Sequence, residues 1–178
     1  MNETQLENLL IKHGFTDFQW LKPERIHVYQ WVRFKCRFGC SSYGKSATCP
    51  PNLPSITDCR EFVAEYRHVL IVHISKVLAK PEDYRAWSND LTRRMYKLEQ
   101  EVFLAGYYKA FLLPANMCTL CNSCSVNRTD CKNPIMSRPC AEAVGIDVYA
   151  AAREVGYPIE VLRDHRQAMN RYAFLLVE

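Results

Sequence analysis

Residues 68–75, HVLIVHIS, are predominantly apolar and rich in β-branched side chains. Such a composition is typical of a buried strand. Before this stretch, Ser55 and Asp58 have the spacing of a capping box, and apolar side chains then recur at helical intervals. The sequence therefore predicts a helix over residues 56–66 that leads into a buried strand.

The longest helical pattern of the chain follows that strand. Pro81 opens it, its apolar side chains share one face, and Gly106 provides the stop. Residues 108–113 predict another strand, which runs through Pro114 into a cysteine-rich segment. Farther out, the patterns predict a helix over residues 3–13, a half-buried strand over 25–35 with Ile26, Val28, Val32 and Phe34 on one side, a helix from Asp147 to near Gly156, and strands over 159–162 and 172–177.

Strand and helix patterns alternate without a linker-like composition or an internal repeat. With 178 residues, of which 48% are hydrophobic and 24% charged, the chain is long enough to bury one core. We therefore expect a single compact domain over residues 1–178, of the α/β class, with α+β as the alternative. Its sheet is expected to be mixed, with about four to five strands flanked by helices, and to carry two cysteine-rich metal-binding loops.

The sequence carries no targeting or membrane signal that we recognise. Its longest apolar stretches fall far short of the roughly 20 residues that cross a bilayer. Residues 1–10 have neither a basic start nor a uniformly apolar run. We therefore expect a cytoplasmic protein without a membrane partner. In that reducing compartment, nine cysteines indicate metal binding rather than disulfides.

The cysteines fall into two groups separated by a long cysteine-free stretch. The first cysteine group has the spacing C-x3-C-x8-C-x9-C and comprises Cys36, Cys40, Cys49 and Cys59. The second cysteine group has the spacing C-x2-C-x2-C-x6-C-x8-C and comprises Cys118, Cys121, Cys124, Cys131 and Cys140. Each group contains enough thiols for a four-coordinate metal site.

Two consecutive C-x2-C steps in the second group wrap three thiolates around one object, which is how bacterial ferredoxins hold a cubane cluster. Zinc sites more often combine two separated pairs of cysteines. The spacing therefore favours a 4Fe-4S cluster, with zinc as the alternative. Cys131 is the natural fourth ligand of this loop.

The first group is looser, and its spacing alone is compatible with a cluster, a zinc site or buried thiols. Cys49 precedes two prolines, which form a rigid exit like the Cys-Pro step of many cluster loops. Cys59 lies on the apolar face of the predicted helix, so it is either a ligand or a packed thiol. Cys140 has the same two interpretations.

The net charge of +4 does not indicate a nucleic-acid partner, because each thiolate-bound cubane would add about two negative charges. Basic side chains surround the first group, namely Arg33, Lys35, Arg37 and Lys45. One interpretation is that they form a solvated face. The functional interpretation is that they compensate the charge of a cluster or provide a docking surface for an acidic redox partner. No histidine, His165 included, stands in a recognisable catalytic constellation, so no catalytic residue is assigned.

Four stretches give the chain a resemblance to a known family. They are KCRFGCSSYGKSATCPPN from Lys35, GYYKAFLLPANMCTLCNSC from Gly106, RPCAEAVGIDVYAAAREVGYPIEVL from Arg138 and NRYAFLLVE from Asn170. Over almost its whole length the chain resembles the uncharacterised "predicted metal-binding protein" family of anaerobic bacteria and archaea. The resemblance implies an iron–sulfur cluster as the usual assignment, no established reaction, and metal ligands at Cys36, Cys40, Cys49, Cys118, Cys121, Cys124 and Cys131. A serine is common in that family at the position of Cys140.

Three functional hypotheses follow. The first is a cytoplasmic iron–sulfur protein with one or two 4Fe-4S clusters, acting in electron transfer or redox chemistry. The second is an enzyme whose cluster has an open iron that acts as a Lewis acid on a small substrate, because the first group without Cys59 has only three thiolates. The third is a structural or regulatory zinc-binding protein.

Overall fold

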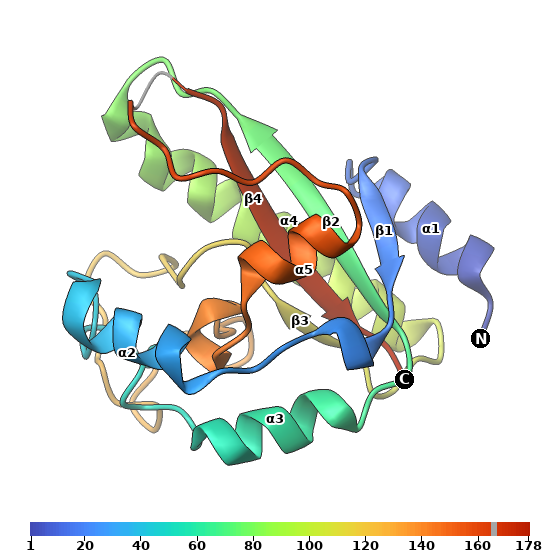
Figure 1. Ribbon diagram of the computed structural model, residues 1–178, viewed down its shortest axis with the longest axis horizontal. Helices are drawn as coiled ribbons and strands as arrows, with labels where there is room; N and C mark the ends of the chain where they lie inside the picture. The colour runs from blue at the N-terminus through green and yellow to red at the C-terminus, as the bar shows by residue number, and fades with distance from the viewer. Residues whose placement is uncertain (165–166) are drawn as a thin grey trace.

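A four-stranded antiparallel sheet forms the centre of the molecule (Figure 1). The computed structural model describes residues 1–164 and 167–178. In the order β1-β2-β4-β3, the strands are β1 (Phe18–Leu21), β2 (Val69–Lys76), β4 (Met169–Leu176) and β3 (Phe111–Leu113). β2 and β4 pair along their full length, so they form the rigid middle of the sheet.

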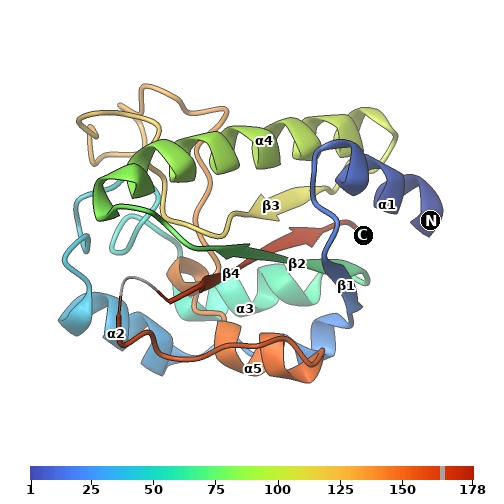
Figure 2. The same ribbon diagram turned by 90° about the horizontal axis from the view of Figure 1, so that it is seen from above.

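Helices cover both faces of the sheet (Figure 2). One face carries α1 (Glu3–Lys12) and α4 (Tyr84–Leu104), and the other carries α2 (Gln30–Gly39), α3 (Ile56–Ala64) and α5 (Val148–Glu154). Three short 3₁₀ turns connect these elements: η1 (Pro23–Arg25), η2 (Pro81–Asp83) and η3 (Glu142–Val144). Within the described residues, no helix combines the length and the apolar character that a membrane span needs.

The alternation of side chains along β2 divides the core into two layers. Leu70 and Val72 pack with α1 and α4, whereas Val69 and Ile71 pack with α3 and α5. Because both faces are covered, residues 69–72 are apolar without alternation. Each such side chain contributes about 1.5–3 kcal/mol when it is fully buried.

The structure confirms the α/β character and most of the predicted elements. α1, α3, α4 and α5 all lie within the predicted helices, and β2, β3 and β4 overlap the predicted strands. The capping box of α3 is present, because the Asp58 amide donates to Ser55 Oγ over 3.1 Å and the Ser55 amide donates to Asp58 Oδ2 over 2.9 Å. The sheet, however, is antiparallel in every pairing and not mixed.

The strand predicted over residues 25–35 is wrong. Ile26 and Val28 are buried as expected, but the chain then enters helix α2 at Gln30. On this helix only Val32 is buried, and Phe34 is 53% exposed. The apparent alternation of apolar side chains therefore does not indicate a half-buried strand. As a consequence, the first cysteine group begins at the end of a helix.

Two smaller predictions also differ from the structure. Residues 159–162, all of them described, form no strand, and the edge strand β1 was not predicted. β1 is only four residues long and has one buried side chain, Leu21, so it carries little apolar signal. His165 lies outside the described residues.

Both cysteine-rich segments meet at one end of the molecule, beside the start of α4 (Figure 2). Residues 41–55 and 114–141 contain neither a helix nor a strand. The Asn52 amide nitrogen joins them, because Nδ2 donates to the Ser46 carbonyl over 3.1 Å and to the Val126 carbonyl over 2.9 Å. Segments far apart in the sequence therefore place their thiols in one region.

Candidate metal centre

Four thiols of the second cysteine group surround one small, enclosed cavity. Its wall contains Cys118, Cys121, Cys124 and Cys131, together with residues 46–48, Asn133 and Ser137. The cavity has a volume of about 20 Å³. The structure thus brings together the four thiols for which the C-x2-C-x2-C-x6-C spacing predicted a common ligand, and residues of the first loop close the opposite side.

Hydrogen-bond donors are directed at these sulfurs. Asn133 Nδ2 lies 3.0 Å from Cys121 Sγ, and the backbone amides of Ala47 and Val126 each lie 3.4 Å from Cys124 Sγ. Burial raises the pKa of the Cys124 thiol, but the two amide bonds, together with the Ser46 side chain and the charge of Lys132, outweigh burial, so the net effect is a lowered pKa. Donors of this kind stabilise thiolate, which is the form that binds metal.

Cys118 is partly buried among the other three thiols. Burial raises its pKa, and the nearby thiols of Cys131, Cys121 and Cys124 raise it further, while a backbone hydrogen bond at Leu120 opposes the rise. The mutual repulsion of four closely spaced thiolates is the situation that a bound cation or cluster relieves.

A side chain of α4 holds this loop in place. Arg85 Nη2 donates to the Cys121 carbonyl over 2.6 Å. Ser88 Oγ also lies 3.4 Å from Thr119 Oγ1. The loop is therefore anchored on one side to α4 and, through Asn52, on the other side to the first cysteine loop.

Cys36, Cys40 and Cys49 of the first cysteine group also lie together. Cys36 occupies the last turn of α2 and Cys40 its C-cap, so the two are one helical turn apart. Cys49 is buried in the following loop, with 8% of its surface exposed. Burial raises its pKa to about 11, a Ser46 hydrogen bond opposes the rise, and the neighbouring thiols of Cys40, Cys36 and Cys118 add to it. Through Cys49 and Cys118 the two cysteine groups adjoin.

Cys59 has different surroundings. It is buried on α3 in the apolar layer that contains Val63 and Ile71. Arg33 Nη2 lies 3.3 Å from its sulfur, and its thiol lies 3.8 Å from the Pro54 carbonyl. Burial raises the pKa of Cys59, and the Arg33 guanidinium opposes that rise.

Cys140 is the last member of the second cysteine group in sequence, but it interacts electrostatically with Cys49 of the first group. It lies two residues before the turn η3, whose Ala143 amide donates to the Cys140 carbonyl over 3.0 Å. The residue keeps some accessible surface, but its thiol lies deep in the molecule, and burial raises its pKa well above the ordinary value. The charged groups that add to this rise are Glu142 and Cys49.

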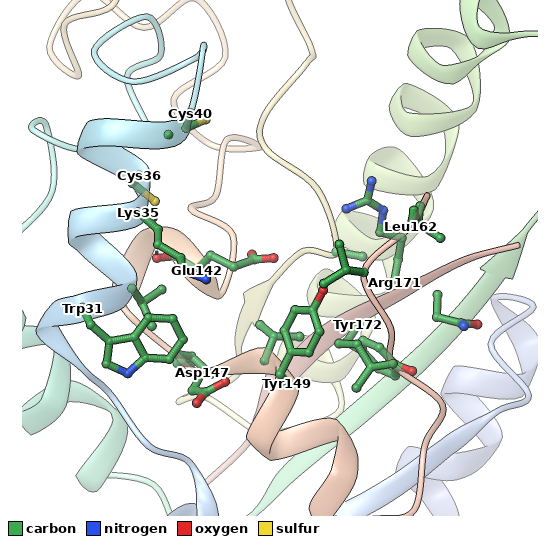
Figure 3. A pocket seen from close by; sticks show the side chains of 18 of the residues that line it. Trp31, Lys35, Cys36, Cys40, Glu142, Asp147, Tyr149, Leu162, Arg171 and Tyr172 are labelled. Atoms are coloured by element: carbon green, nitrogen blue, oxygen red, sulfur yellow. Dashed lines mark hydrogen bonds between the residues drawn. The ribbon is translucent and has the colours of Figure 1, made fainter. Parts of the chain in front are cut away.

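A large pocket adjoins Cys36 and Cys40 (Figure 3). It has a volume of about 690 Å³ and lies between α2 on one side and α5 with β4 on the other. Trp31, Tyr149 and Leu162 supply apolar walls, and charged side chains line it as well, namely Lys35, Glu142, Asp147 and Arg171. A pocket of this size and mixed lining is suited to a small molecule.

A single zinc ion needs its ligand atoms about 2.0–2.3 Å from one point. Within residues 1–164 and 167–178, no three His, Cys, Asp or Glu side chains are grouped closely enough to hold one ion. The thiols of the second cysteine group are instead distributed around the wall of a cavity.

Sequence reasoning did not single out the polar neighbours of the thiols. Asn133 and Ser137 lie between Cys131 and Cys140, and Ser46 precedes Cys49. Their closeness in sequence to a cysteine was the one signal that pointed to them. Glu142 had a similar signal, two residues after Cys140.

The protein belongs to a family of predicted metal-binding proteins. The model of that family, described as "Predicted metal-binding protein (DUF2284)", matches residues 19–177. The match spans both cysteine groups and the whole sheet except the start of β1. Comparison with curated proteins and with solved structures finds no match.

Proposed function

We propose that the protein carries a 4Fe-4S cluster at Cys118, Cys121, Cys124 and Cys131 and acts in electron transfer or redox chemistry in the cytoplasm. One observation supports this most strongly: a single loop distributes four thiols around an enclosed cavity. A cubane has four irons at its corners and takes one thiolate at each, so it suits ligands that surround a volume.

The donor set fits such a cluster. All four ligands are thiolates, and N–H groups point at Cys121 and Cys124. The cavity of about 20 Å³ is smaller than a cubane, so the loop has to widen around it. The widening disrupts no helix or strand, because residues 114–141 are irregular and most of them are half-buried or exposed. When bound, such a cluster takes up and releases one electron at a time.

The residues of the chain then have distinct tasks. The amides of Ala47 and Val126 and the side chain of Asn133 stabilise negative charge on the ligand sulfurs. Residues 46–48 close the cavity and limit access of water. Cys36, Cys40 and Cys49, which adjoin this site, are ligands for a second cluster.

All nine cysteines are free thiols. A chain with this many free thiols is expected in a reducing compartment, where disulfides do not persist. This supports the cytoplasm as the location.

We further propose an acidic redox protein as the partner, docking on the exposed face of α2. Cys40 is exposed at the end of this helix, and Phe38 beside it is 74% exposed. Lys35 and Arg37 lie on the same helix. The Lys35 ammonium lies 5.2 Å from the ring centroid of Trp31, and the Arg37 guanidinium lies 5.5 Å from that of Phe38. An acidic surface would be steered to this basic face, and reduction by an acidic ferredoxin-type protein should therefore slow as salt rises.

The deciding experiment measures iron, zinc and acid-labile sulfide per chain in protein purified without oxygen. About four or about eight irons, with equal sulfide, are expected for one or two cubanes. Zinc without sulfide would disprove the redox proposal and leave a structural or regulatory zinc protein. The Cys121→Ala variant should lose one full cluster, because the central thiolate of this tight loop has no substitute nearby.

A second candidate is an enzyme that uses an open iron as a Lewis acid on a small substrate. The pocket of about 690 Å³ beside Cys36 and Cys40 favours it, because a substrate there would lie against the first cysteine group. Cyanide is a suitable probe, since it binds an iron that lacks a protein ligand. An unchanged electron paramagnetic resonance spectrum of the reduced protein after cyanide addition would contradict an open iron.

A further inference from the structure

The pocket of about 690 Å³ has the sheet as one of its walls (Figure 3). In the described structure, β3 pairs with residues 174–176 of β4, so residues 170–172 extend past the end of β3 and line the pocket. Trp31 and Lys35 of α2 form the opposite wall. Because β4 is paired with β2 along its full length, the side chains on the sheet wall have a rigid support.

Arg171 on the sheet wall has no acidic partner among the described residues. None of their ion pairs includes it. Its Nε is buried and, within the same residues, has no hydrogen-bond partner. Nη2 has only a weak contact printed by its geometry, with Met169 Sδ at 4.0 Å, and the guanidinium carbon lies 6.0 Å from the centre of the Tyr84 ring. A half-buried guanidinium is best satisfied by a planar anion that accepts two parallel hydrogen bonds, so Arg171 is suited to a carboxylate.

Aromatic side chains form the walls on either side. Trp31 of α2 and Tyr149 of α5 face the pocket from different helices (Figure 3). They keep 45% and 38% of their surfaces exposed, which is much for large rings beside a pocket. Leu162 adds a further apolar side chain. Such surfaces are suited to cover an aromatic ring of a ligand.

The charges of the lining limit the charge of that ligand. Glu142, Asp147 and Glu160 line the pocket as well, against the two basic side chains Lys35 and Arg171. A phosphate monoester carries about −1.5 to −2 charges at pH 7, so these carboxylates would repel it strongly. A carboxylate with one negative charge meets less repulsion and pairs with Arg171 alone.

We propose that this pocket binds a small carboxylic acid with an aromatic body, whose carboxylate pairs with Arg171 and whose ring lies between Trp31 and Tyr149. The inference goes beyond the proposed function, because none of the recognising side chains is a cysteine. Cys36 and Cys40 border the pocket, so the bound acid lies beside the first cysteine group.

The test compares naphthylacetate with its neutral amide, naphthylacetamide, by isothermal titration calorimetry on the full-length protein purified without oxygen. The acid should bind about ten- to a hundredfold more tightly than the amide, because the charge-assisted hydrogen bonds to Arg171 distinguish the two compounds. Naphthyl phosphate should bind more weakly than the acid, because of its higher charge.

Variants assign the preference for the acid to one side chain. Arg171→Met should abolish it, and Arg171→Lys, which keeps the charge without the planar fork, should reduce it. Arg153→Met is the matched control: it removes the same charge 5.7 Å from the Tyr149 ring centre, but Arg153 does not line the pocket, so the preference should persist. Trp31→Ala should weaken binding of acid and amide by the same factor. Circular dichroism checks that each variant is folded.

Equal affinity of the acid and the amide for the wild type, or no saturable binding of either, would overturn the proposal. A preference that survives in Arg171→Met would do the same, and tighter binding of naphthyl phosphate would replace the carboxylate by a phosphate ligand. Iron and acid-labile sulfide are measured in the same preparation. Binding of the acid to protein without iron would contradict the cluster function and leave the carboxylate site in place, whereas iron without binding would do the reverse.

Discussion

Arg138 Nε lies 3.0 Å from Glu99 Oε1 in the interior, where the Glu99 side chain is only 5% exposed. The same carboxylate oxygen accepts a hydrogen bond from the Leu112 amide over 2.9 Å. Arg138 follows the second cysteine loop, and Glu99 belongs to α4. This ion pair therefore links the end of the second cysteine loop to α4.

Removal of Arg138 alone should be costly. The Arg138→Met variant leaves the Glu99 carboxylate buried without its cation, which typically costs about 3–5 kcal/mol. The free energy of unfolding, measured by urea denaturation, should fall by several kcal/mol. The double variant with Glu99→Met should recover most of the loss, and a single-variant loss below about 1 kcal/mol would contradict the role of the pair.

The hydrogen bond from Asn133 to Cys121 should tune the reduction potential of the cluster proposed at the second cysteine group. Without the donor at 3.0 Å, the more negative reduced state loses stabilisation. A bond worth about 1 kcal/mol corresponds to roughly 40 mV for one electron, so Asn133→Ala should lower the potential by tens of millivolts. Redox titration measures it.

Asn127→Ala is the matched control. Asn127 lies in the same loop, but its side chain bonds to Asp130 over 3.3 Å and accepts from the Thr129 amide over 3.2 Å, and no bond of it to a sulfur is present in the described structure. Its potential should stay within a few millivolts of the wild type. Equal shifts in both variants would show a general loosening of the loop.

The difference between the two cysteine groups shows what the sequence can predict. The thiols Cys118, Cys121 and Cys124 are close in sequence, so their spacing alone predicted that they share one wall. Cys36 Sγ lies 3.9 Å from the Glu142 carbonyl oxygen only because α2 packs on η3, and no local pattern indicates that contact. The helix α2 itself was misread as a strand, because Phe34 is apolar and yet exposed.

The same reasoning applies to the scaffold. Residues 68–75 and the pattern after Pro81 were predicted well, because buried strands and long amphipathic helices have strong periodic signals. β1 has four residues and one buried side chain, and it is a strand because β2 offers it an edge. Such a tertiary cause leaves little trace in the sequence.

Removal of metal should loosen the cysteine segments and leave the sheet intact. Residues 41–55 and 114–141 have no regular backbone hydrogen bonding, whereas β2 and β4 are paired along eight residues and largely buried. Hydrogen exchange measured by mass spectrometry should therefore accelerate in these segments after chelation. Equal acceleration in β2 would show that the metal holds the whole fold.

Stability at acid pH should depend on Asp17. Burial raises the pKa of its carboxyl, but hydrogen bonds from His73 at 2.7 Å and Tyr157 at 2.8 Å outweigh burial and lower it below the ordinary value. A group with a lowered folded pKa stabilises the protein above its unfolded pKa near 3.9, and this stabilisation is lost as pH falls through the folded pKa. The stability difference between wild type and Asp17→Asn should therefore shrink on acidification.

Urea denaturation at a series of pH values between about 6 and 2.5 tests this prediction. Asp90→Asn is the control, because Asp90 forms an exposed pair with Arg94 at 3.0 Å and exposed pairs contribute at most about 1 kcal/mol. A difference for Asp17→Asn that is constant over the whole range would disprove the linkage.

Gly145 ends the turn η3 in a conformation that few other residues adopt, with φ of 91°. A Cβ at this position would lie 2.5 Å from Ile56 Cδ1 and 3.3 Å from the Tyr29 carbonyl oxygen. Gly145→Ala should therefore destabilise the protein through both backbone strain and overpacking, each of which costs about 1–2 kcal/mol.

Gly156→Ala separates the two effects, because Gly156 has φ of 77° but nothing within 4 Å of a Cβ. It should lose only the strain contribution, about 1 kcal/mol. Because α2 packs on η3 and Cys36 Sγ lies 3.9 Å from the Glu142 carbonyl oxygen, Gly145→Ala should also lower the iron content while Gly156→Ala does not. Equal iron in both variants would show that the position of η3 is independent of the metal centre.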